Sequence, residues 1–343
     1  MPRTMLLRDW LSTQLTRQFP GQDYQIEPAS TDASFRRYFR VTLPDGTTRI
    51  AMDAPPEHED CRPFLKVAAL LHEAGVHVPT VHAEDLAQGF LLLSDLGSTT
   101  YLSALNETTA PKLYRDANIA LVAIQRASRP GVLPEYDRAL LERELQLFPD
   151  WYVARHLGIT LDETQQATLR SVFDKILANN LAQPQVFVHR DYHSRNLMVS
   201  GENGVSTFPD NPGILDFQDA VYGPITYDLA SLYRDAYIHW EEDQELDFVI
   251  RYWEMARKAG LPVHADFHDF YRDYEWMGAQ RQLKVLGIFA RLSHRDGKDG
   301  YLQDMPTVMA YLRQTCERYL DLRPLARLFD QLENKQPEIG YTF

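Results

Sequence analysis

One short stretch of the sequence, residues 189–196, carries polar side chains at spacings that suit the transfer of a phosphoryl group. It reads HRDYHSRN, and a second acidic residue, Asp216, follows a hairpin in the run GILDF. An Asp can accept the proton of a hydroxyl group, and an Asn five residues later offers a hard oxygen ligand. A separate Asp can hold a divalent cation against phosphate oxygens. Asp191 is therefore predicted as the proton acceptor, and Asn196 and Asp216 as metal ligands.

Short strands are expected to hold these side chains on rigid supports, because three apolar runs, QVFVH, NLMVS and GILDF, occur between residues 185 and 217. His189 is predicted to be structural, packing and hydrogen-bonding to hold the loop. Asp228 falls in the first turn of a predicted helix, where a carboxylate suits the positive end of the helix dipole. We expect Asp228 to brace the backbone of the loop and not to react.

The same stretch permits a second interpretation. His189, Asp191 and His193 form an H-x-D-x-H pattern that could ligate Zn²⁺ in a hydrolase. Such a metal site normally needs another ligand cluster elsewhere, and it would leave Asn196 and Asp216 without a role. Phosphoryl transfer therefore explains more of the pattern, and His193 is placed among the expected substrate contacts.

The elements that must position these residues change in character along the chain. The first part reads as a small, mostly antiparallel sheet with one internal helix. Its expected elements are helices at residues 3–19 and 62–74 and strands at residues 37–43, 47–53, 80–84 and 90–94. Past residue 97 a period of 3.6 residues dominates, apart from the stretch around residues 185–217. The main expected helices there are residues 111–126, 138–157 with an interruption at Pro149, and 161–180.

Composition and charge exclude several classes of protein. The 343 residues are 44% hydrophobic and carry a formal net charge of −13, with no basic stripe of the kind that binds polynucleotides. Cys61 and Cys316 are too few for a disulfide framework or a zinc cluster. No signal peptide and no stretch of about 18 apolar residues is apparent. We expect a cytoplasmic monomer that binds neither nucleic acid nor a membrane.

The chemical pattern resembles that of the aminoglycoside/choline kinase-like phosphotransferases. The matching positions are His189, Asp191, His193 and Asn196 for the H-x-D-x-H-x-x-N loop, Asp216 for the later metal ligand, and Asp228-Leu229-Ala230 for the helix start. Residues 189–196 also fit the catalytic loop of protein kinases. The resemblance covers nearly the whole chain and implies ATP and Mg²⁺ as cofactors.

Within that family the sequence is most similar to the bacterial N-acetylmuramate/N-acetylglucosamine anomeric kinases of cell-wall recycling. The segments that carry this similarity are residues 32–38, 52–56, 148–151, 189–196 and 280–287. The resemblance implies an enzyme that phosphorylates the C1 hydroxyl of a free amino sugar with ATP. The product would be a sugar 1-phosphate.

The resemblance also implies an α+β, protein-kinase-like fold with two lobes. A small antiparallel β-sheet lobe, residues 1–95, would bind the nucleotide. A larger, mainly helical lobe, residues 96–343, would carry the catalytic loop and bind the substrate.

The nucleotide site departs from the protein-kinase pattern in two ways. The third strand, residues 49–53, contains no Lys, and the loop at residues 29–34 contains no Gly. Arg36, Arg37 or Arg49 could supply the missing charge, although a guanidinium is not equivalent to an ammonium. The adenine is expected against the linker. The predicted nucleotide contacts are Ser30, Thr31, Ser34, Arg36, Ile50, Met52, Ser94, Asp95 and Leu96.

The sugar site is expected in the helical lobe. Asp150, Trp151 and Arg155 share a broken helix, and Trp151 could stack on a pyranose face. Arg155, Arg234 or Arg281 is expected to pair with the lactyl carboxylate of N-acetylmuramate.

Two other functions remain open at this point. A kinase for another small alcohol, such as an aminoglycoside, choline or homoserine, is compatible with the acidic net charge. A catalytically inactive nucleotide-binding pseudokinase would account for the absent Lys and Gly. The intact set of Asp191, Asn196 and Asp216 favours an enzyme, because a mere binder needs no proton acceptor.

Overall fold

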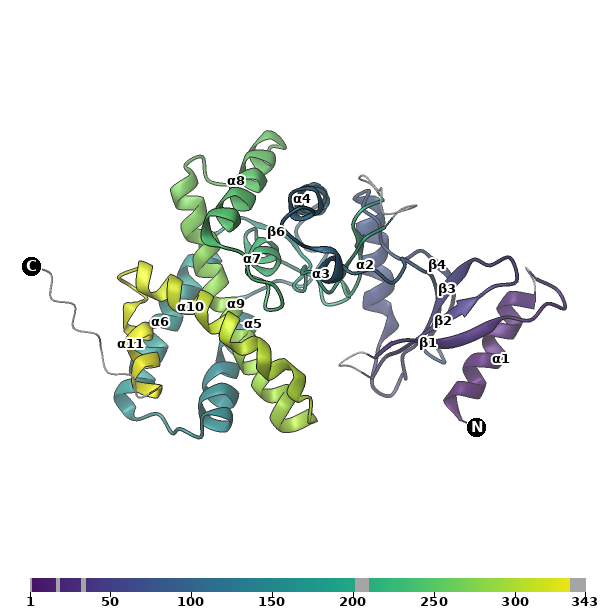
Figure 1. Cartoon of the computed structure of the whole chain (residues 1–343), viewed down its shortest axis with the longest axis horizontal. Coiled ribbons are helices and arrows are strands. Elements are labelled where there is room, and N and C mark those ends of the chain that lie inside the picture. Colours follow the sequence, from purple (N-terminus) through teal and green to yellow (C-terminus); the bar gives the residue numbers. More distant parts are fainter. Residues whose placement is uncertain (1, 17–18, 32–34, 201–209, 334–343) are drawn as a thin grey trace, which may run out of the picture. The chain divides into compact units, whose positions relative to one another are not determined.

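The computed structural model describes residues 2–16, 19–31, 35–200 and 210–333 (Figure 1). Its contacts divide the chain into two compact units. Unit 1 comprises Met1–Leu105 with Arg195–Asp219, and unit 2 comprises Asn106–Ser194 with Ala220–Phe343. The α+β architecture expected from the sequence is confirmed, while the functional boundary after residue 95 stays a prediction.

Unit 1 is built on an antiparallel five-stranded sheet with the strand order β1-β2-β3-β5-β4. Its elements are α1 (Arg3–Thr16), β1 (Gln25–Thr31), β2 (Arg37–Thr42), β3 (Thr48–Asp53), α2 (Cys61–Glu73), β4 (Val81–Asp85), β5 (Phe90–Ser94), α3 (Tyr101–Ala104), β7 (Leu197–Met198) and β8 (Gly213–Ile214). The four strands predicted for this region are confirmed. Strand β1 was not predicted, because its sequence, QIEPAST, lacks the apolar alternation of a typical strand.

The core of unit 1 lies between α1 and the sheet. Leu7, Trp10, Leu11 and Leu15 recur at helical spacing and are buried against Val41, Ala51, Phe90 and Leu92. These four side chains form one apolar stripe of α1, which covers one face of the sheet.

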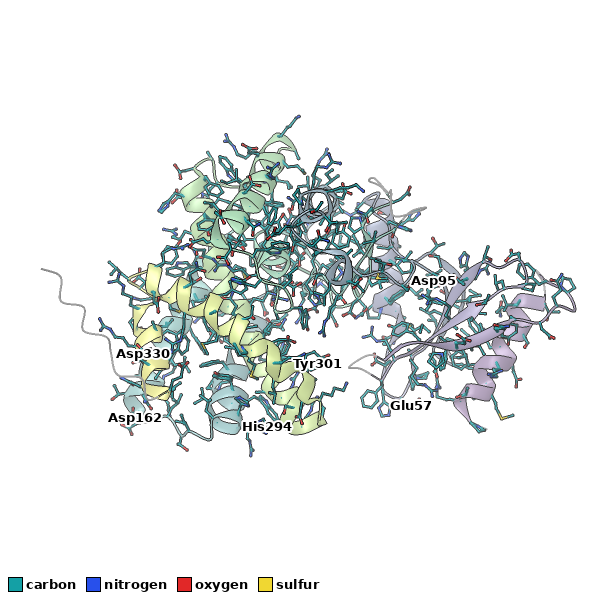
Figure 2. All side chains as sticks on the ribbon, viewed as in Figure 1. Glu57, Asp95, Asp162, His294, Tyr301 and Asp330 are labelled. Carbon is teal, nitrogen blue, oxygen red and sulfur yellow. The ribbon has the colours of Figure 1, made fainter. Side chains whose placement is uncertain are left out.

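The described residues of unit 2 are mainly helical and include one short strand pair, β6-β9. Its elements are α4 (Ala110–Arg126), α5 (Arg138–Leu147), η1 (Phe148–His156), α6 (Glu163–Ala182), β6 (Gln185–Val188), β9 (Val221–Pro224), α7 (Tyr227–Tyr233), α8 (Glu242–Lys258), α9 (Phe267–Asp296), η3 (Asp299–Asp304), α10 (Met305–Arg318) and α11 (Arg323–Leu332). Helix α6 begins with a capping box between Asp162, labelled in Figure 2, and Gln165.

Helix α9, which has 30 residues, is the centre of unit 2 and packs against α5, η1, α6, α7, α8 and α10. Its first turn is capped by Asp266, and Gly297 ends it with a left-handed φ of 66°. Because neighbours surround it, its middle turns bury polar and charged side chains as well as apolar ones. No described helix is long and apolar enough to cross a membrane.

The helix predicted for residues 138–157 is broken at Pro149, as expected, but it continues in an unexpected form. Helix α5 ends at Leu147, and η1 is a π-helix. Proline has no backbone N–H to donate, so the ordinary hydrogen-bond ladder fails at this position. A π-helix is rare and often occurs at functional sites.

The junction between α5 and η1 approaches α9 at Gly287. A Cβ on Gly287 would lie 2.4 Å from the carbonyl carbon of Leu147 and 2.5 Å from its oxygen. Helix propensity favours Gly287→Ala by about 1 kcal/mol. A backbone cannot give way as a flexible side chain can, so we expect a net loss of about 1–2 kcal/mol in the free energy of unfolding. Urea unfolding measures this loss.

Gly300→Ala is the matched control, because a Cβ there meets no atom within 4 Å. It should change the free energy of unfolding by less than about 0.5 kcal/mol. Equal stabilities of the Gly287 and Gly300 variants would show that the steric cost of a Cβ beside Leu147 is no larger than the gain in helix propensity.

Candidate active site

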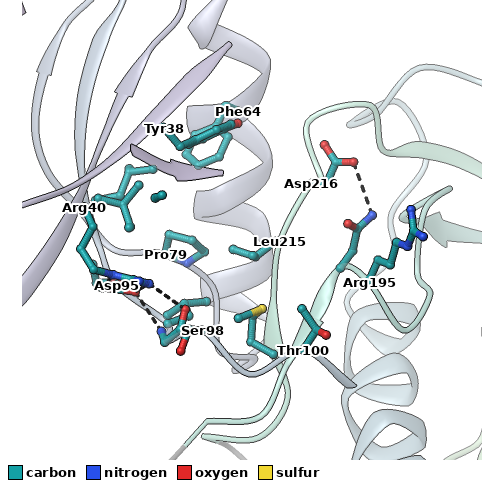
Figure 3. A pocket seen from close by; sticks show the side chains of 18 residues that line it. Tyr38, Arg40, Phe64, Pro79, Asp95, Ser98, Thr100, Arg195, Leu215 and Asp216 are labelled. Atoms are coloured by element: carbon teal, nitrogen blue, oxygen red, sulfur yellow. Dashed lines mark hydrogen bonds and ion pairs between the residues drawn. The ribbon is translucent and has the colours of Figure 1, made fainter. Parts of the chain in front are cut away.

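A cavity of about 410 Å³ opens within unit 1 (Figure 3). That volume lies in the range of small-molecule sites. Apolar side chains from the sheet, α2 and the β7-β8 segment form much of its wall, among them Ile50, Phe64, Leu93, Met198 and Leu215. The cavity therefore offers an apolar surface for a flat ring together with a few polar groups.

Two of those polar groups are the predicted metal ligands, Asn196 and Asp216. The pairing of Leu197 with Ile214 brings their segments together, and Asn196 Nδ2 lies 3.4 Å from Asp216 Oδ2. Gln218 Nε2 donates to the other carboxylate oxygen at 2.7 Å. The spacing in the sequence therefore corresponds to real proximity.

The donor chemistry of this pair suits Mg²⁺, which prefers carboxylate and carbonyl oxygens. Turning the amide of Asn196 would present its Oδ1 beside the carboxylate of Asp216. Asp216 has a φ of 61°, in the left-handed region that few side chains other than glycine adopt. Backbone strain of this kind concentrates at functional sites.

The linker after β5, where nucleotide contacts are predicted, lines the same cavity. Ser94, Asp95 and Leu96 are all in its wall, together with Ile50. Asp95 accepts a hydrogen bond from Arg40 Nε at 2.5 Å, across the cavity from Asp216 (Figure 3). Burial alone would raise the pKa of Asp95, but hydrogen bonds from Arg40 and the Gly97 N–H hold that pKa below its usual value.

The other predicted nucleotide residues fall in different places. Met52 is buried at 1% exposure and does not line the cavity. Arg36 pairs with Glu59 at 3.1 Å, and its charge also interacts with Asp216. Ser34 and the side chains of Ser30 and Thr31 lie outside the described part of the structure.

Three arginines were considered as replacements for the missing Lys, and one of them, Arg37, forms an ion pair within the protein. Its Nε donates at 3.1 Å to Asp53, which Arg3 also contacts. The charge of Arg36 acts on Asp216. The choice among them for the phosphates remains a prediction.

Unit 2 contains the loop with Asp191. The carboxylate of Asp228 accepts hydrogen bonds from the backbone N–H groups of His189 at 2.7 Å and Arg190 at 3.0 Å, which is the contact expected of a brace. Asp235, which the sequence analysis missed, accepts from Ser194 N at 2.9 Å. Arg190 has a φ of 77°, and these two acids hold the loop on either side of Asp191.

Charges within unit 2 keep Asp191 ionised. Burial by itself would raise the pKa of this carboxyl, but Lys284, His193 and Arg281 together lower that pKa below its ordinary value. Asp228 differs, because burial raises its pKa to about 6. Asp191 is thus a carboxylate at neutral pH and able to accept a proton.

The pattern of His189, Asp191 and His193 does not form a metal centre. Among the described residues there is no group of three His, Cys, Asp or Glu side chains that could hold a metal ion. His189 Nδ1 instead accepts a hydrogen bond from the Asp191 N–H at 3.2 Å. The zinc hydrolase considered from the sequence therefore lacks a ligand set in this part of the chain.

The predicted sugar contacts divide into exposed and buried residues. On η1, Asp150 and Arg155 are exposed and Trp151 is half-buried. His193 packs edge-on to Tyr237 with ring centroids 5.6 Å apart, and burial lowers its pKa. Arg281 is buried on α9.

Arg234 is a correction to the sequence analysis. Its guanidinium is buried and pairs with Glu245 at 2.8 Å and with Glu275 at 2.9 Å, and it donates to Thr315 at 2.6 Å. A cation that is satisfied by two carboxylates is not available to a substrate carboxylate. The sequence could not reveal this, because both glutamates come from other helices.

Comparisons with known proteins agree with this geometry. Residues 25–269 match the Phosphotransferase enzyme family. The chain is 49% identical to an N-acetylmuramate/N-acetylglucosamine kinase of Neisseria meningitidis over 100% of both chains. It is also 49% identical to the protein of that name from Pseudomonas aeruginosa, over 96% of this chain and 97% of the relative.

Solved structures support the same fold. A choline/ethanolamine kinase family protein from Mesorhizobium loti superposes with a TM-score of 0.61 at 16% identity, over 94% of this chain and 99% of that one. A choline kinase from Streptococcus pneumoniae gives a TM-score of 0.60 at 12% identity, over 90% and 99%. The resemblance seen in the sequence is thus confirmed, and the chain belongs to the phosphotransferase enzyme family.

Proposed function

We propose that the protein transfers the γ-phosphoryl group of ATP to the C1 hydroxyl of N-acetylmuramate or N-acetylglucosamine, giving the sugar 1-phosphate. The observation that carries the proposal is the 49% identity, over the full length, to a kinase named for these two sugars. The adjacent oxygens of Asn196 and Asp216 and the ionised Asp191 fit the chemistry. We place the reaction in the cytoplasm, in peptidoglycan recycling, and expect a monomer.

The nucleotide would occupy the cavity of unit 1, with its adenine against the linker at residues 94–96. Asn196 and Asp216 would hold Mg²⁺, which when bound neutralises phosphate oxygens. Ser30, Thr31, Ser34 and Arg36 are proposed to contact the phosphates. In this assignment residues 1–95 serve the nucleotide, and residues 96–343 supply the catalytic loop and bind the substrate.

Asp191 would accept the proton of the anomeric hydroxyl as its oxygen bonds to the γ-phosphorus and the bond to ADP breaks. A carboxylate with a lowered pKa is a weak base, so it orients the hydroxyl early and takes the proton late. His189 and Asp228 would keep the loop in place.

The sugar would lie against residues of unit 2. Trp151 on η1 offers an apolar ring that can stack on one face of a pyranose. Its indole N–H can donate a hydrogen bond at the edge of that ring. Asp150, Arg155, His193 and Arg281 are the proposed polar contacts.

The test is direct. Purified protein is incubated with ATP, Mg²⁺ and, separately, N-acetylmuramate, N-acetylglucosamine, kanamycin, choline and homoserine, while ADP release is followed. NMR then locates the phosphate. Phosphate on C6 would reject the anomeric assignment, turnover only with kanamycin, choline or homoserine would establish the alternative kinase, and nucleotide binding without turnover would indicate a pseudokinase.

The metal assignment predicts the behaviour of Asp216→Asn. Loss of one carboxylate charge should lower kcat at fixed Mg²⁺ by about 100-fold, because charge stabilisation by the metal contributes several kcal/mol. The Mg²⁺ concentration needed for half-maximal rate should also rise. Both quantities come from initial rates across a Mg²⁺ titration.

Asp219→Asn is the matched control, since this exposed acid lies three residues further along the chain. It should leave the Mg²⁺ titration unchanged. Identical titrations for Asp216→Asn and wild type would remove Asp216 from the metal site.

A further inference from the structure

Arg281 on α9 differs from the other buried cations of unit 2. It is 6% exposed, yet among the residues that the structure describes no carboxylate lies within 4.0 Å of its guanidinium. Arg234 and Lys284 are buried to a similar extent, and each contacts a glutamate, Glu245 at 2.8 Å and Glu144 at 3.2 Å respectively. Arg281 therefore carries a buried charge that no carboxylate in the described part of the chain pairs.

The position of Arg281 is close to the proposed base. Its charge helps to lower the pKa of Asp191 and also that of His193, while it makes no ion pair with Asp191. It lies one turn before Lys284 on the same rigid helix. The guanidinium thus acts on the charge of Asp191 without pairing with it.

A buried charge without a partner is unfavourable, and an anionic group of a ligand would relieve that cost. The planar guanidinium fork matches a carboxylate with two parallel hydrogen bonds. The two sugars in the relatives' name differ in one respect: N-acetylmuramate has a lactyl ether with a carboxylate at C3, and N-acetylglucosamine has a hydroxyl there. The C3 substituent and the C1 hydroxyl belong to one ring, so the carboxylate lies near the reacting oxygen without touching it.

We propose that Arg281 binds the lactyl carboxylate and so selects the acidic sugar over the neutral one. The inference rests on the proposed function and deepens it, because it assigns the discrimination between the two sugars to one residue. Of the three arginines considered from the sequence, Arg234 is neutralised by two glutamates and Arg155 is exposed to water, which screens its charge.

The experiment compares kcat/KM for both sugars in wild type, Arg281→Met and Arg281→Lys. The ratio of kcat/KM for N-acetylmuramate to that for N-acetylglucosamine should fall by about 30-fold or more in Arg281→Met, the loss typical of truncating one partner of a buried charge pair. Most of the change should appear in KM for N-acetylmuramate. Arg281→Lys keeps the charge and should retain part of the preference.

Arg272→Met, which removes an exposed arginine from the same helix, is the matched control and should leave the ratio unchanged. A ratio that stays at the wild-type value in Arg281→Met overturns the proposal, whether both activities fall together or neither does.

A substrate-side measurement applies even if Arg281→Met does not fold. The methyl ester of N-acetylmuramate has no negative charge, so wild-type kcat/KM for the ester should fall at least 30-fold below that for the acid. Equal use of the ester and the acid would overturn the proposal. Wild type that phosphorylates neither free sugar would instead refute the proposed function, so the two failures are distinguishable.

Discussion

Asp191→Asn lowers kcat by about 10³-fold, within the range for loss of a positioned general base, and this is the largest effect on activity that we expect. Asparagine has the same shape as aspartate but cannot accept the hydroxyl proton. The fold should persist, because Asp228 and Asp235 hold the loop through its backbone. Single-turnover rates with the preferred sugar measure the loss.

Nucleotide binding and urea unfolding serve as controls for Asp191→Asn, and both should match wild type closely. Since the pKa of Asp191 is lowered, its carboxyl stays ionised from pH 6 to 8 and should impose no pH dependence on the wild-type kcat there. Activity controlled by this group should fall only at more acidic pH, as the carboxylate becomes protonated. A variant that retains kcat within about fivefold of wild type would remove Asp191 from the role of base.

Arg234→Met should reduce the free energy of unfolding by about 3–5 kcal/mol, the largest loss of stability that we expect. The change removes the cation that Glu245 and Glu275 share, and both side chains are almost completely inaccessible to water. Glu275 keeps a second partner, Arg318 at 2.5 Å, so the main cost is the buried charge of Glu245. Urea unfolding with a fixed m-value measures the effect.

Two further variants sharpen this test. Adding Glu245→Gln to Arg234→Met removes the carboxylate that loses its cation, while Glu275 keeps its ion pair with Arg318, and should recover part of the lost stability. Arg272→Met, at an exposed site, should cost less than about 0.5 kcal/mol. If Arg234→Met were as stable as wild type and only KM for the sugar rose, the original assignment of Arg234 to the substrate would be restored.

The sequence was most informative where local spacing decides the structure. The strand pair that brings Asn196 beside Asp216 was predicted from two short apolar runs close together in the sequence, and the two residues indeed lie together. The four predicted strands of the five-stranded sheet have clear apolar patterns and turn residues. Strand β1 escaped prediction because tertiary pairing with β2, rather than its own composition, holds it in the sheet.

The sequence was least informative about charged residues far apart in the chain. Arg234 and Arg281 look alike as isolated arginines, yet one meets two glutamates and the other meets none among the described residues. Which acid lies beside which base depends on how α7, α8 and α9 pack, and helical periodicity does not encode that. The same reason explains why Asp235 was overlooked, because it contacts a loop about forty residues away in the sequence. The π-helix η1 was not predicted because a π-helix has no sequence pattern of its own.

The two carboxylates that hold the loop around Asp191 have a thermodynamic consequence. Asp228 and Asp235 fix three backbone N–H groups of that loop through hydrogen bonds within the protein itself. The conformational entropy of the loop is therefore given up once, when the chain folds, and not again in each catalytic cycle. A small sugar with few contacts can then use its binding energy to align its own hydroxyl.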